Sequence, residues 1–244
     1  MKNVEKLIND LVGYDNLKIV QSNDYFNFSL DSVLLPNFVE LKKNTQNIID
    51  LGCGNAPIPL ILSTKTNSKI IGIEIQKEIY DLAIETVELN KLESQIEIKN
   101  IDIKDIFDHY KRESFDLVLS NPPYFKLNEK SILNENEVKT NARHETLIKL
   151  DELISISSKL LKNKGALVLI HRTERIQEIL EIMSKNKLEA KRIRFVFPKK
   201  NENSNLVLID ARKNANRGVK VLPPLLTHKA NGDYTKEILK MFER

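Results

Sequence analysis

The residues of this 244-residue chain best suited to chemistry are Asn121, Pro122, Pro123 and Tyr124, which follow an apolar run at residues 115–120. The run is typical of a buried strand, and two prolines can neither continue a strand ladder nor start a helix cleanly. In the stiff loop that results, the Asn121 side-chain oxygen and the Pro122 carbonyl are neighbouring acceptors beside an aromatic ring. This arrangement suits a planar –NH2 group. The alternative is a simple turn, in which Asn121 caps the backbone and Tyr124 packs on the core.

A glycine-containing turn at residues 50–54 (DLGCG) follows another predicted strand. Two glycines let the backbone approach a ligand closely, and the next helix would point its amino terminus at the same place. Pro57 stands where a pyrophosphate-binding G-x-G-x-x-G motif has its third glycine, and no Gly-Lys-Ser/Thr sequence of a Walker loop follows. Taken alone, the turn is also compatible with a purely structural role.

Acidic residues end the next two predicted strands. Glu74 lies 24 residues after Asp50 and is placed to accept hydrogen bonds from both hydroxyls of a ribose. A solvent-facing carboxylate is the other interpretation of Glu74. Asp102 follows the third strand, where it could accept a hydrogen bond from an adenine amine or cap the next helix. Because parallel strands end at one edge of a sheet, we expect Asp50, Glu74 and Asp102 to line one pocket.

The elements that must position these residues alternate regularly from residue 47 onward. Strands alternating with helices indicate an α/β, Rossmann-like fold, with a mainly parallel central sheet and helices on both faces. The connection at residues 198–204 is too short for a crossover helix and predicts a C-terminal antiparallel strand pair. We predict strands at residues 48–51, 69–73, 95–98, 115–119, 166–170, 192–197 and 205–211, and helices at 57–63, 77–90, 103–109, 147–161 and 175–185.

Three segments are expected along the chain. Residues 1–45 form a lead-in over the cofactor site, residues 46–212 the core, and residues 213–244 a basic tail that is partly ordered at best. Within the first and last segments we predict a short helix at residues 4–11, strands at 17–20 and 25–28 joined through 22–24, a helix capped by Asp31 with Pro36 near its first turn, and a final helix at 234–242.

Composition narrows the class of protein. Hydrophobic residues make up 41% and charged residues 30%, which excludes a disordered chain, and no apolar run is long enough to span a membrane. The first residues lead into no signal-peptide core, so we expect a cytoplasmic protein, as a monomer or weak homodimer. Cys53 is the single cysteine, which precludes an internal disulfide, and the histidines lack metal-ligand spacing, so no metal is expected.

Positive charge gathers near the C-terminus although the whole chain carries only +4. Residues 185–230 hold twelve Lys and Arg against three Asp and Glu, a net of +9. This distribution favours a nucleic acid docking on that region, while a solvated basic face is the alternative. The candidate phosphate contacts are Lys191, Arg192, Arg194, Lys199, Lys200, Arg212 and Lys213.

These motifs, in this order and spacing, resemble the class I S-adenosylmethionine-dependent methyltransferases that methylate exocyclic amines. Residues 19–21 (IVQ), 26–35 (FNFSLDSVLL) and 142–145 (ARHE), with the closing strand pair, are similar to the tRNA1(Val) adenine-37 N6-methyltransferase family. The resemblance covers nearly the whole chain. It implies S-adenosyl-L-methionine as cofactor and the N6 amine of adenine in tRNA, at A37 of a valine tRNA, as methyl acceptor. Residues 56–57 (AP) depart from the family, in which another glycine is common there.

Carried over to this chain, the resemblance assigns five residues to the cofactor. Asp50, Gly52 and Gly54 would shape the methionine side of the site. Glu74 would hold the ribose, and Asp102 would accept a hydrogen bond from the adenine amine of the cofactor.

The resemblance also implies a grip on the target base. Asn121, which borders the cofactor as well, and the Pro122 carbonyl would accept hydrogen bonds from the N6 amine, and Tyr124 would stack on the base. The adenine would have to be splayed out of its loop to enter the pocket. Arg143 is a candidate RNA contact, with a surface salt bridge as the alternative.

Several other functions stay open at this point. A protein glutamine N5-methyltransferase uses the same Asn-Pro-Pro-Tyr motif, but normally carries a helical domain before the glycine turn, and only 49 residues precede Asp50 here. A DNA adenine methyltransferase would need a larger insertion for target recognition. An rRNA base N-methyltransferase is harder to exclude. Intact Glu74, Asn121 and Tyr124 argue against a nucleic-acid-binding module with an inactive pocket.

Overall fold

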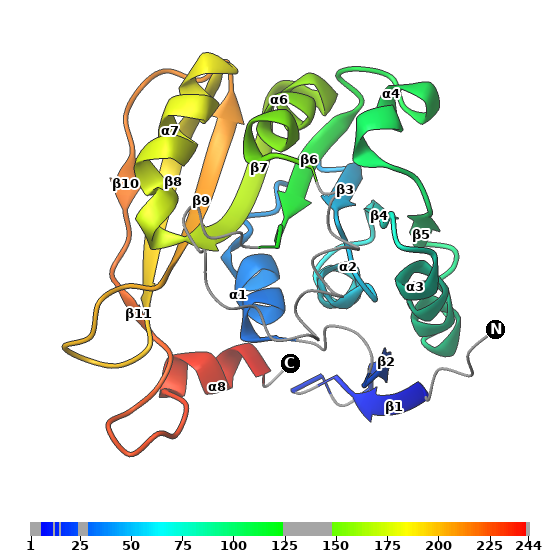
Figure 1. Cartoon of the computed structure of the whole chain (residues 1–244), viewed down its shortest axis with the longest axis horizontal. Coiled ribbons are helices and arrows are strands. Elements are labelled where there is room, and N and C mark those ends of the chain that lie inside the picture. Colours follow the sequence, from blue (N-terminus) through cyan, green and yellow to red (C-terminus); the bar gives the residue numbers. More distant parts are fainter. Residues whose placement is uncertain (1–5, 12, 15, 24–28, 124–147, 243–244) are drawn as a thin grey trace, which may run out of the picture.

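The computed structural model describes residues 6–11, 13–14, 16–23, 29–123 and 148–242. Its centre is a nine-stranded sheet with the order β10-β8-β9-β7-β6-β3-β4-β5, in which β11 also pairs with β8 (Figure 1). The strands of this sheet are β3 (Asn47–Leu51), β4 (Lys69–Ile73), β5 (Ile96–Lys99), β6 (Phe115–Ser120), β7 (Leu161–Arg172), β8 (Leu188–Phe197), β9 (Leu206–Lys213), β10 (Lys220–Val221) and β11 (Leu225–Leu226).

Strand directions confirm the predicted fold class. Strands β3 to β7 run parallel, whereas β9 lies antiparallel between β7 and β8. The short connection between β8 and β9 leaves no room for a crossover helix, and this is why the last pair turns back on itself. The helices are α1 (Leu30–Phe38), α2 (Pro57–Ser63), α3 (Lys77–Leu89), α4 (Ile106–His109), α6 (Leu150–Leu160), α7 (Ile176–Lys185) and α8 (Lys236–Phe242), with 3-10 turns η1 (Ile103–Asp105) and η2 (Thr173–Arg175).

The sheet is covered on both faces, so its strands are apolar on both sides. Successive residues alternate between two cores: Ile48 packs with α1 and α2, and Ile49 packs with α6. The same alternation places Leu117 in the first core and Val118 in the second. Continuous apolar runs are the expected sequence pattern of such doubly covered parallel strands.

The N-terminal segment differs from the prediction. Residues 6–10 form a strand, β1 (Lys6–Asp10), that pairs antiparallel with β2 (Lys18–Ser22), so the predicted helix at residues 4–11 is wrong. The apolar spacing in this segment imitates a helical face, but β1 is exposed along its whole length and is defined by its pairing with β2. The turn between β1 and β2 lies before residue 18, and the predicted connection through residues 22–24 stays a prediction because residue 24 and the segment after it lie outside the described residues. Residues 25–28, predicted as a strand, lie outside the described residues.

Helix α1 starts near the predicted position but with a different arrangement. Its N-cap is Ser29, while Asp31 lies in the first turn, and Pro36 lies close to the carboxyl end of the helix. An acidic residue in the first turn is favourable there because of the helix dipole. Pro36 lacks an N–H and cannot donate to the Ser32 carbonyl four residues earlier, and the helix ends two residues after it at Phe38.

The C-terminal tail is ordered as part of the fold up to residue 242, contrary to the prediction of partial order. Strands β10 and β11 both add to β8 in parallel, and α8 lies next to α1 (Figure 1). A Cβ added to Gly13, in the β1–β2 turn, would overlap the backbone of Phe242. The N-terminal hairpin and the final helix are therefore in direct contact. None of the helices in the described ranges is long and apolar enough to cross a bilayer.

Candidate active site

The predicted site residues lie at the carboxyl ends of four adjacent parallel strands. The segment 50–54 comprises the last two residues of β3 and the turn after them, Glu74 follows β4, Asp102 follows β5 and Asn121 follows β6. Since β5, β4, β3 and β6 are consecutive in the sheet, these residues lie along one edge. Ligands in open α/β sheets bind at this edge.

The glycine turn adopts left-handed backbone conformations. Gly52 has φ 80° and Gly54 has φ 57°, values at which a side chain is strained. A Cβ at either position would meet no heavy atom of the described residues within 4 Å, so these residues leave the space beside the turn open. The N–H groups of Gly52 and Cys53 both donate to the Ile73 carbonyl at 2.9 Å, and these bonds fix the turn to β4.

Ala56, where the sequence departs from the family, also has a left-handed conformation, with φ 72°. It is fully buried and is the N-cap of α2, and Pro57 occupies the first position of the helix. Proline is well accommodated there because the first helical N–H needs no intrahelical partner. The Ala-Pro pair therefore keeps the start of α2 next to the turn.

Glu74 is oriented by the backbone around it. Its carboxylate accepts hydrogen bonds from the Gly54 N–H at 3.1 Å and from the Gln76 N–H at 2.8 Å. Burial raises the pKa of Glu74, and these N–H donors partly offset the rise. The Asn100 side chain donates to the Glu74 and Ile75 carbonyls at 2.9 Å, and so connects the ends of β4 and β5.

Asp50 is fully buried, and neither of its carboxylate oxygens has a hydrogen-bond partner among the described residues. Burial, and secondarily the charge of Glu74, raise the pKa of Asp50 to about 8. Buried carboxylates are normally paired or hydrogen-bonded, because an unpartnered buried charge is costly. Asp50 is therefore a buried acceptor without a donor among the described residues, two residues before Gly52 of the glycine turn.

Asp102 makes the capping contact that was one of its two predicted roles. Its carboxylate accepts a hydrogen bond from the Lys104 N–H at 2.9 Å at the start of η1. The side chain is only half-buried, so the cap leaves part of the carboxylate accessible. Its role toward an adenine amine stays a prediction.

Asn121 and Pro122 leave the end of β6 as a half-buried, non-helical segment, as predicted. Strand β6 pairs with β3, so this loop starts beside the glycine turn. Tyr124 and Arg143, predicted to contact the base and the RNA, lie outside the described residues.

Two of the predicted phosphate contacts share a buried carboxylate. Arg212 Nε lies 2.9 Å from one oxygen of Asp210, and Arg192 Nη1 lies 3.4 Å from the other. Arg192 also pairs with Glu40 at 2.9 Å and stacks its guanidinium over the Phe38 ring. These contacts attach α1 to the outer strands β8 and β9.

Two further predicted phosphate contacts have intramolecular partners as well. Arg194 pairs with Glu237 of α8 at 2.6 Å, and Lys213 pairs with Glu113 at 2.9 Å. The Lys213 ammonium also donates to the Leu161 carbonyl. Any contact of these side chains with RNA would compete with the existing ion pairs, and their assignment to phosphates stays a prediction.

The remaining cations are Lys191, Lys199 and Lys200. Lys191 donates to the Asn216 carbonyl at 3.0 Å. Lys199 and Lys200 lie in the turn between β8 and β9, and the register of the strands places this turn at the carboxyl end of β7. Strand β8 is three strands from β6, which corresponds to roughly 14 Å at the usual strand spacing. These two lysines therefore share the sheet edge of Asn121.

Three residues that the sequence interpretation did not select support the glycine turn. The Ser120 hydroxyl donates to the Leu51 carbonyl at 2.7 Å, and the Asn55 side chain donates to the Val20 carbonyl at 2.8 Å. A Cβ at Gly72 would come within 2.7 Å of the Cys53 sulfur. A glycine inside a strand is a known signal of close backbone approach, so Gly72 could have been found from the sequence.

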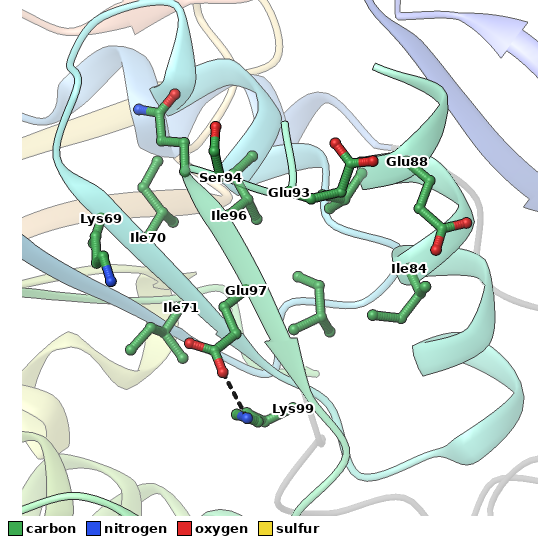
Figure 2. A pocket seen from close by; sticks show the side chains of 13 residues that line it. Lys69, Ile70, Ile71, Ile84, Glu88, Glu93, Ser94, Ile96, Glu97 and Lys99 are labelled. Carbon is green, nitrogen blue, oxygen red and sulfur yellow. Dashed lines mark ion pairs between the residues drawn. The ribbon is translucent and has the colours of Figure 1, made fainter. Parts of the chain in front are cut away.

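A separate pocket lies along the outer edge of β5, between this strand and α3 (Figure 2). Its lining includes apolar side chains such as Ile84 and Ile96 and the ion pair of Glu97 with Lys99. None of the predicted cofactor residues lines it. The pocket is thus distinct from the site at the carboxyl ends of the strands.

The site suits S-adenosylmethionine on its own geometry. The glycine turn can approach the methionine portion closely, and Asp50, two residues before Gly52, has a carboxylate with no hydrogen-bond partner among the described residues. Glu74 already has its carboxylate directed toward the turn. A cation such as a sulfonium or ammonium group would stabilise the ionised form of both acids.

Comparison with solved structures shows the same fold. A protein described as a predicted O-methyltransferase from Agrobacterium tumefaciens matches with a TM-score of 0.69 at 20% identity, covering 87% of this chain and 96% of that one. TYW2 from P. horikoshii, solved in complex with MeSAdo, matches with a TM-score of 0.58 at 14% identity, covering 88% of this chain and 73% of that one. Both likenesses confirm the class I methyltransferase architecture.

Comparison with sequences gives the family. A tRNA1(Val) (adenine(37)-N6)-methyltransferase from Porphyromonas gingivalis is 28% identical over 204 residues, covering 81% of this chain and 78% of the relative. The enzyme of the same name from Christiangramia forsetii is 27% identical over 182 residues, covering 74% and 75%. The model of the methyltransferase small domain matches residues 29–197, which is more than half of the chain. The chain therefore belongs to the methyltransferase small domain family and is an S-adenosylmethionine-dependent methyltransferase.

Proposed function

We propose that this enzyme methylates the exocyclic N6 amine of an adenine in tRNA, with A37 of a valine tRNA as the target and the cytoplasm as its location. The observation that carries the proposal is the position of Asn121 and Pro122 at the end of β6, beside the glycine turn that ends β3. An acceptor pair next to a methyl-donor site is the arrangement that an amine substrate requires. The names of the relatives from Porphyromonas gingivalis and Christiangramia forsetii support the choice of tRNA.

The cofactor would be held by the residues at the ends of β3, β4 and β5. Gly52 and Gly54 would leave room for its methionine portion, and the carboxylates of Asp50 and Glu74, which interact electrostatically, would face its positive charge. Asp102 would complete the site at the adenine end. When bound, S-adenosylmethionine supplies an electrophilic methyl group.

Asn121 and Pro122 would orient the nucleophile. The Asn121 side-chain oxygen and the Pro122 carbonyl would each accept one N–H of the target amine, which directs its lone pair toward the methyl group. Holding reactants in such an orientation is a large part of catalysis for a transfer of this kind. The product amine becomes acidic as it forms and releases its proton to solvent, so no strong general base is needed.

The RNA would approach along the edge that carries Lys199 and Lys200. These lysines follow β8 at the carboxyl end of β7, on the side of the sheet where Asn121 leaves β6. Contacts of lysines with phosphates provide affinity with little sequence preference. Base choice would then depend on the pocket that receives the splayed adenine.

Labelled S-adenosylmethionine, incubated with the enzyme and total tRNA lacking this modification, tests the proposal. We expect label in tRNA, recovered as N6-methyladenosine on nucleoside analysis, and enrichment in a valine tRNA after fractionation. Parallel reactions contain rRNA and a total protein extract. Label in rRNA or protein in place of tRNA would overturn the assignment.

A further inference from the structure

Ser120 is the last residue of β6 and directly precedes Asn121. Its side chain is fully buried, and its hydroxyl donates to the Leu51 carbonyl at 2.7 Å. Leu51 in turn is the last residue of β3 and directly precedes Gly52 of the glycine turn. One hydrogen bond thus joins the residues next to the two halves of the candidate site.

The position of this bond in the sheet explains why a hydroxyl is present there. The register of β3 with β6 ends at the pair Asp50 and Leu119. One residue further along, the Leu51 carbonyl is buried and needs a hydrogen-bond donor, and the Ser120 hydroxyl donates to it. On the opposite side of β3, Gly52 and Cys53 donate to the Ile73 carbonyl of β4. The turn is therefore fixed from both neighbouring strands, by main-chain donors on one side and by Ser120 on the other.

We propose that Ser120 is a positioning residue that sets the distance between the cofactor turn and the amine-accepting Asn121, an inference that rests on the proposed function. The methyl group would lie at the end of β3 and the acceptor amine at the end of β6, and this hydrogen bond joins the ends of these two strands. Reacting atoms must lie about 3–3.5 Å apart, and a displacement of about 1 Å can lower the rate about 100-fold. Removing the hydroxyl releases the β6 side of the turn while its bonds to β4 remain.

Ser157 provides a matched control. It is also fully buried, and its hydroxyl also donates to a leucine carbonyl, that of Leu153, at 2.7 Å. Ser157 lies within α6 and takes no part in the site. Ser120→Ala and Ser157→Ala therefore remove the same group from two equally buried hydrogen bonds.

The experiment measures single-turnover methyl transfer to tRNA at saturating cofactor, together with the cofactor Kd by calorimetry. Ser120→Ala should slow transfer by about tenfold or more with the Kd changed less than about threefold, because the turn keeps its bonds to β4. Ser157→Ala should stay within about twofold of wild type in both measurements. Equal transfer rates for the two variants, or a loss of cofactor binding in Ser120→Ala that matches its loss of rate, would overturn the inference.

A second measurement separates this inference from the proposed function. Amide hydrogen exchange, followed by NMR without any substrate, should be faster at Asn121 in Ser120→Ala and unchanged there in Ser157→Ala. If the wild-type enzyme transfers no methyl group to tRNA, the proposed function fails, while the exchange result still decides whether Ser120 holds Asn121. Unchanged exchange at Asn121 in both variants contradicts the inference.

Discussion

Gly54 donates its backbone N–H to a carboxylate oxygen of Glu74 at 3.1 Å, so the glycine turn itself orients the acid at the end of β4. The Gln76 N–H holds the other oxygen at 2.8 Å. The two motifs, 20 residues apart in the chain, form one unit in which the carboxylate has a fixed direction. Such preorganisation lowers the entropy that a ligand would lose on binding.

Glu74→Gln is expected to weaken cofactor binding. The amide keeps the size of the side chain but offers one acceptor oxygen in place of two and carries no charge. Each hydrogen bond to a charged group contributes about 1.5–3 kcal/mol, so the Kd measured by calorimetry should rise about 10- to 100-fold. Glu78→Gln, at an exposed position in the first turn of α3, is the control and should leave the Kd unchanged. An unaltered Kd in Glu74→Gln would show that this acid does not hold the cofactor.

Asp50 is expected to make the stability of the free enzyme fall as pH rises. Its pKa is raised to about 8 in the folded state, chiefly by burial, from an ordinary value of 3.8. The folded state therefore binds a proton more strongly than the unfolded state between about pH 4 and 8, and stability declines through this window. Asp50→Asn should remove this decline and be more stable than wild type at pH 8, by about 2 kcal/mol or more, in chemical denaturation without cofactor.

Asp116 gives the opposite behaviour and serves as the control for Asp50. Burial would raise its pKa, but the Lys162 ammonium and the backbone N–H groups of Asn47 and Gln46 outweigh burial and lower it. Stability from this carboxylate is present above the unfolded pKa and is lost as pH falls. Asp116→Asn should therefore lower stability at pH 8. If Asp50→Asn lost stability at pH 8 as well, the unpartnered state of Asp50 would be refuted.

Asn121→Ala is expected to abolish methyl transfer while cofactor binding is nearly retained. Its proposed partner is the substrate amine, and removing one well-placed catalytic dipole typically lowers kcat by about 100- to 1000-fold. Asn121→Asp, which keeps an acceptor oxygen, should retain more activity than the alanine variant. The measurements are the transfer rate at saturating tRNA and the cofactor Kd. A Kd that rises in parallel with the loss of rate would assign Asn121 to the cofactor alone.

Lys199 and Lys200 are expected to contribute to tRNA affinity by neutralising phosphates. Replacing both by alanine should weaken binding and reduce the slope of log K against log salt by about 0.7 for each phosphate that is no longer neutralised. The double variant Lys185→Ala, Lys187→Ala is the control. It removes the same charge just before the start of β8, whereas Lys199 and Lys200 follow the end of that strand. Binding to unmodified tRNA at several salt concentrations compares the two. Equal losses of affinity in both double variants would indicate a diffuse charge effect without a defined RNA path.

The core of the fold could be predicted because local patterns and burial agree there. Strand β4 and helix α2 match their predicted ranges, since apolar runs between turn residues leave few alternatives. Strand β1 could not be found, because its apolar spacing is compatible with a helix and its conformation depends on pairing with β2. Its exposure shows that no buried face identifies it.

The site was predictable to the extent that its residues stand at strand ends. Asp50 lies in the last two residues of a parallel strand, Glu74, Asp102 and Asn121 follow such strands, and the sheet order brings all four to one edge. The partners of the basic residues were not predictable, because Arg192 meets Asp210 only through the antiparallel pairing of β8 with β9. Sequence charge alone does not distinguish a cation that faces solvent from one that already has a carboxylate.

The contact between Gly13 and Phe242 links the final helix to the support of the glycine turn. Strand β2 follows that hairpin turn, and its Val20 carbonyl accepts a hydrogen bond from the side chain of Asn55, which lies next to the glycine turn. The hairpin also rests on α3, because the Val20 N–H donates to the Thr86 hydroxyl and the Lys18 N–H donates to the Asn90 side chain. Helices α3 and α8 thus brace the same hairpin, so two elements far apart in the sequence act together on the glycine turn without touching a ligand there.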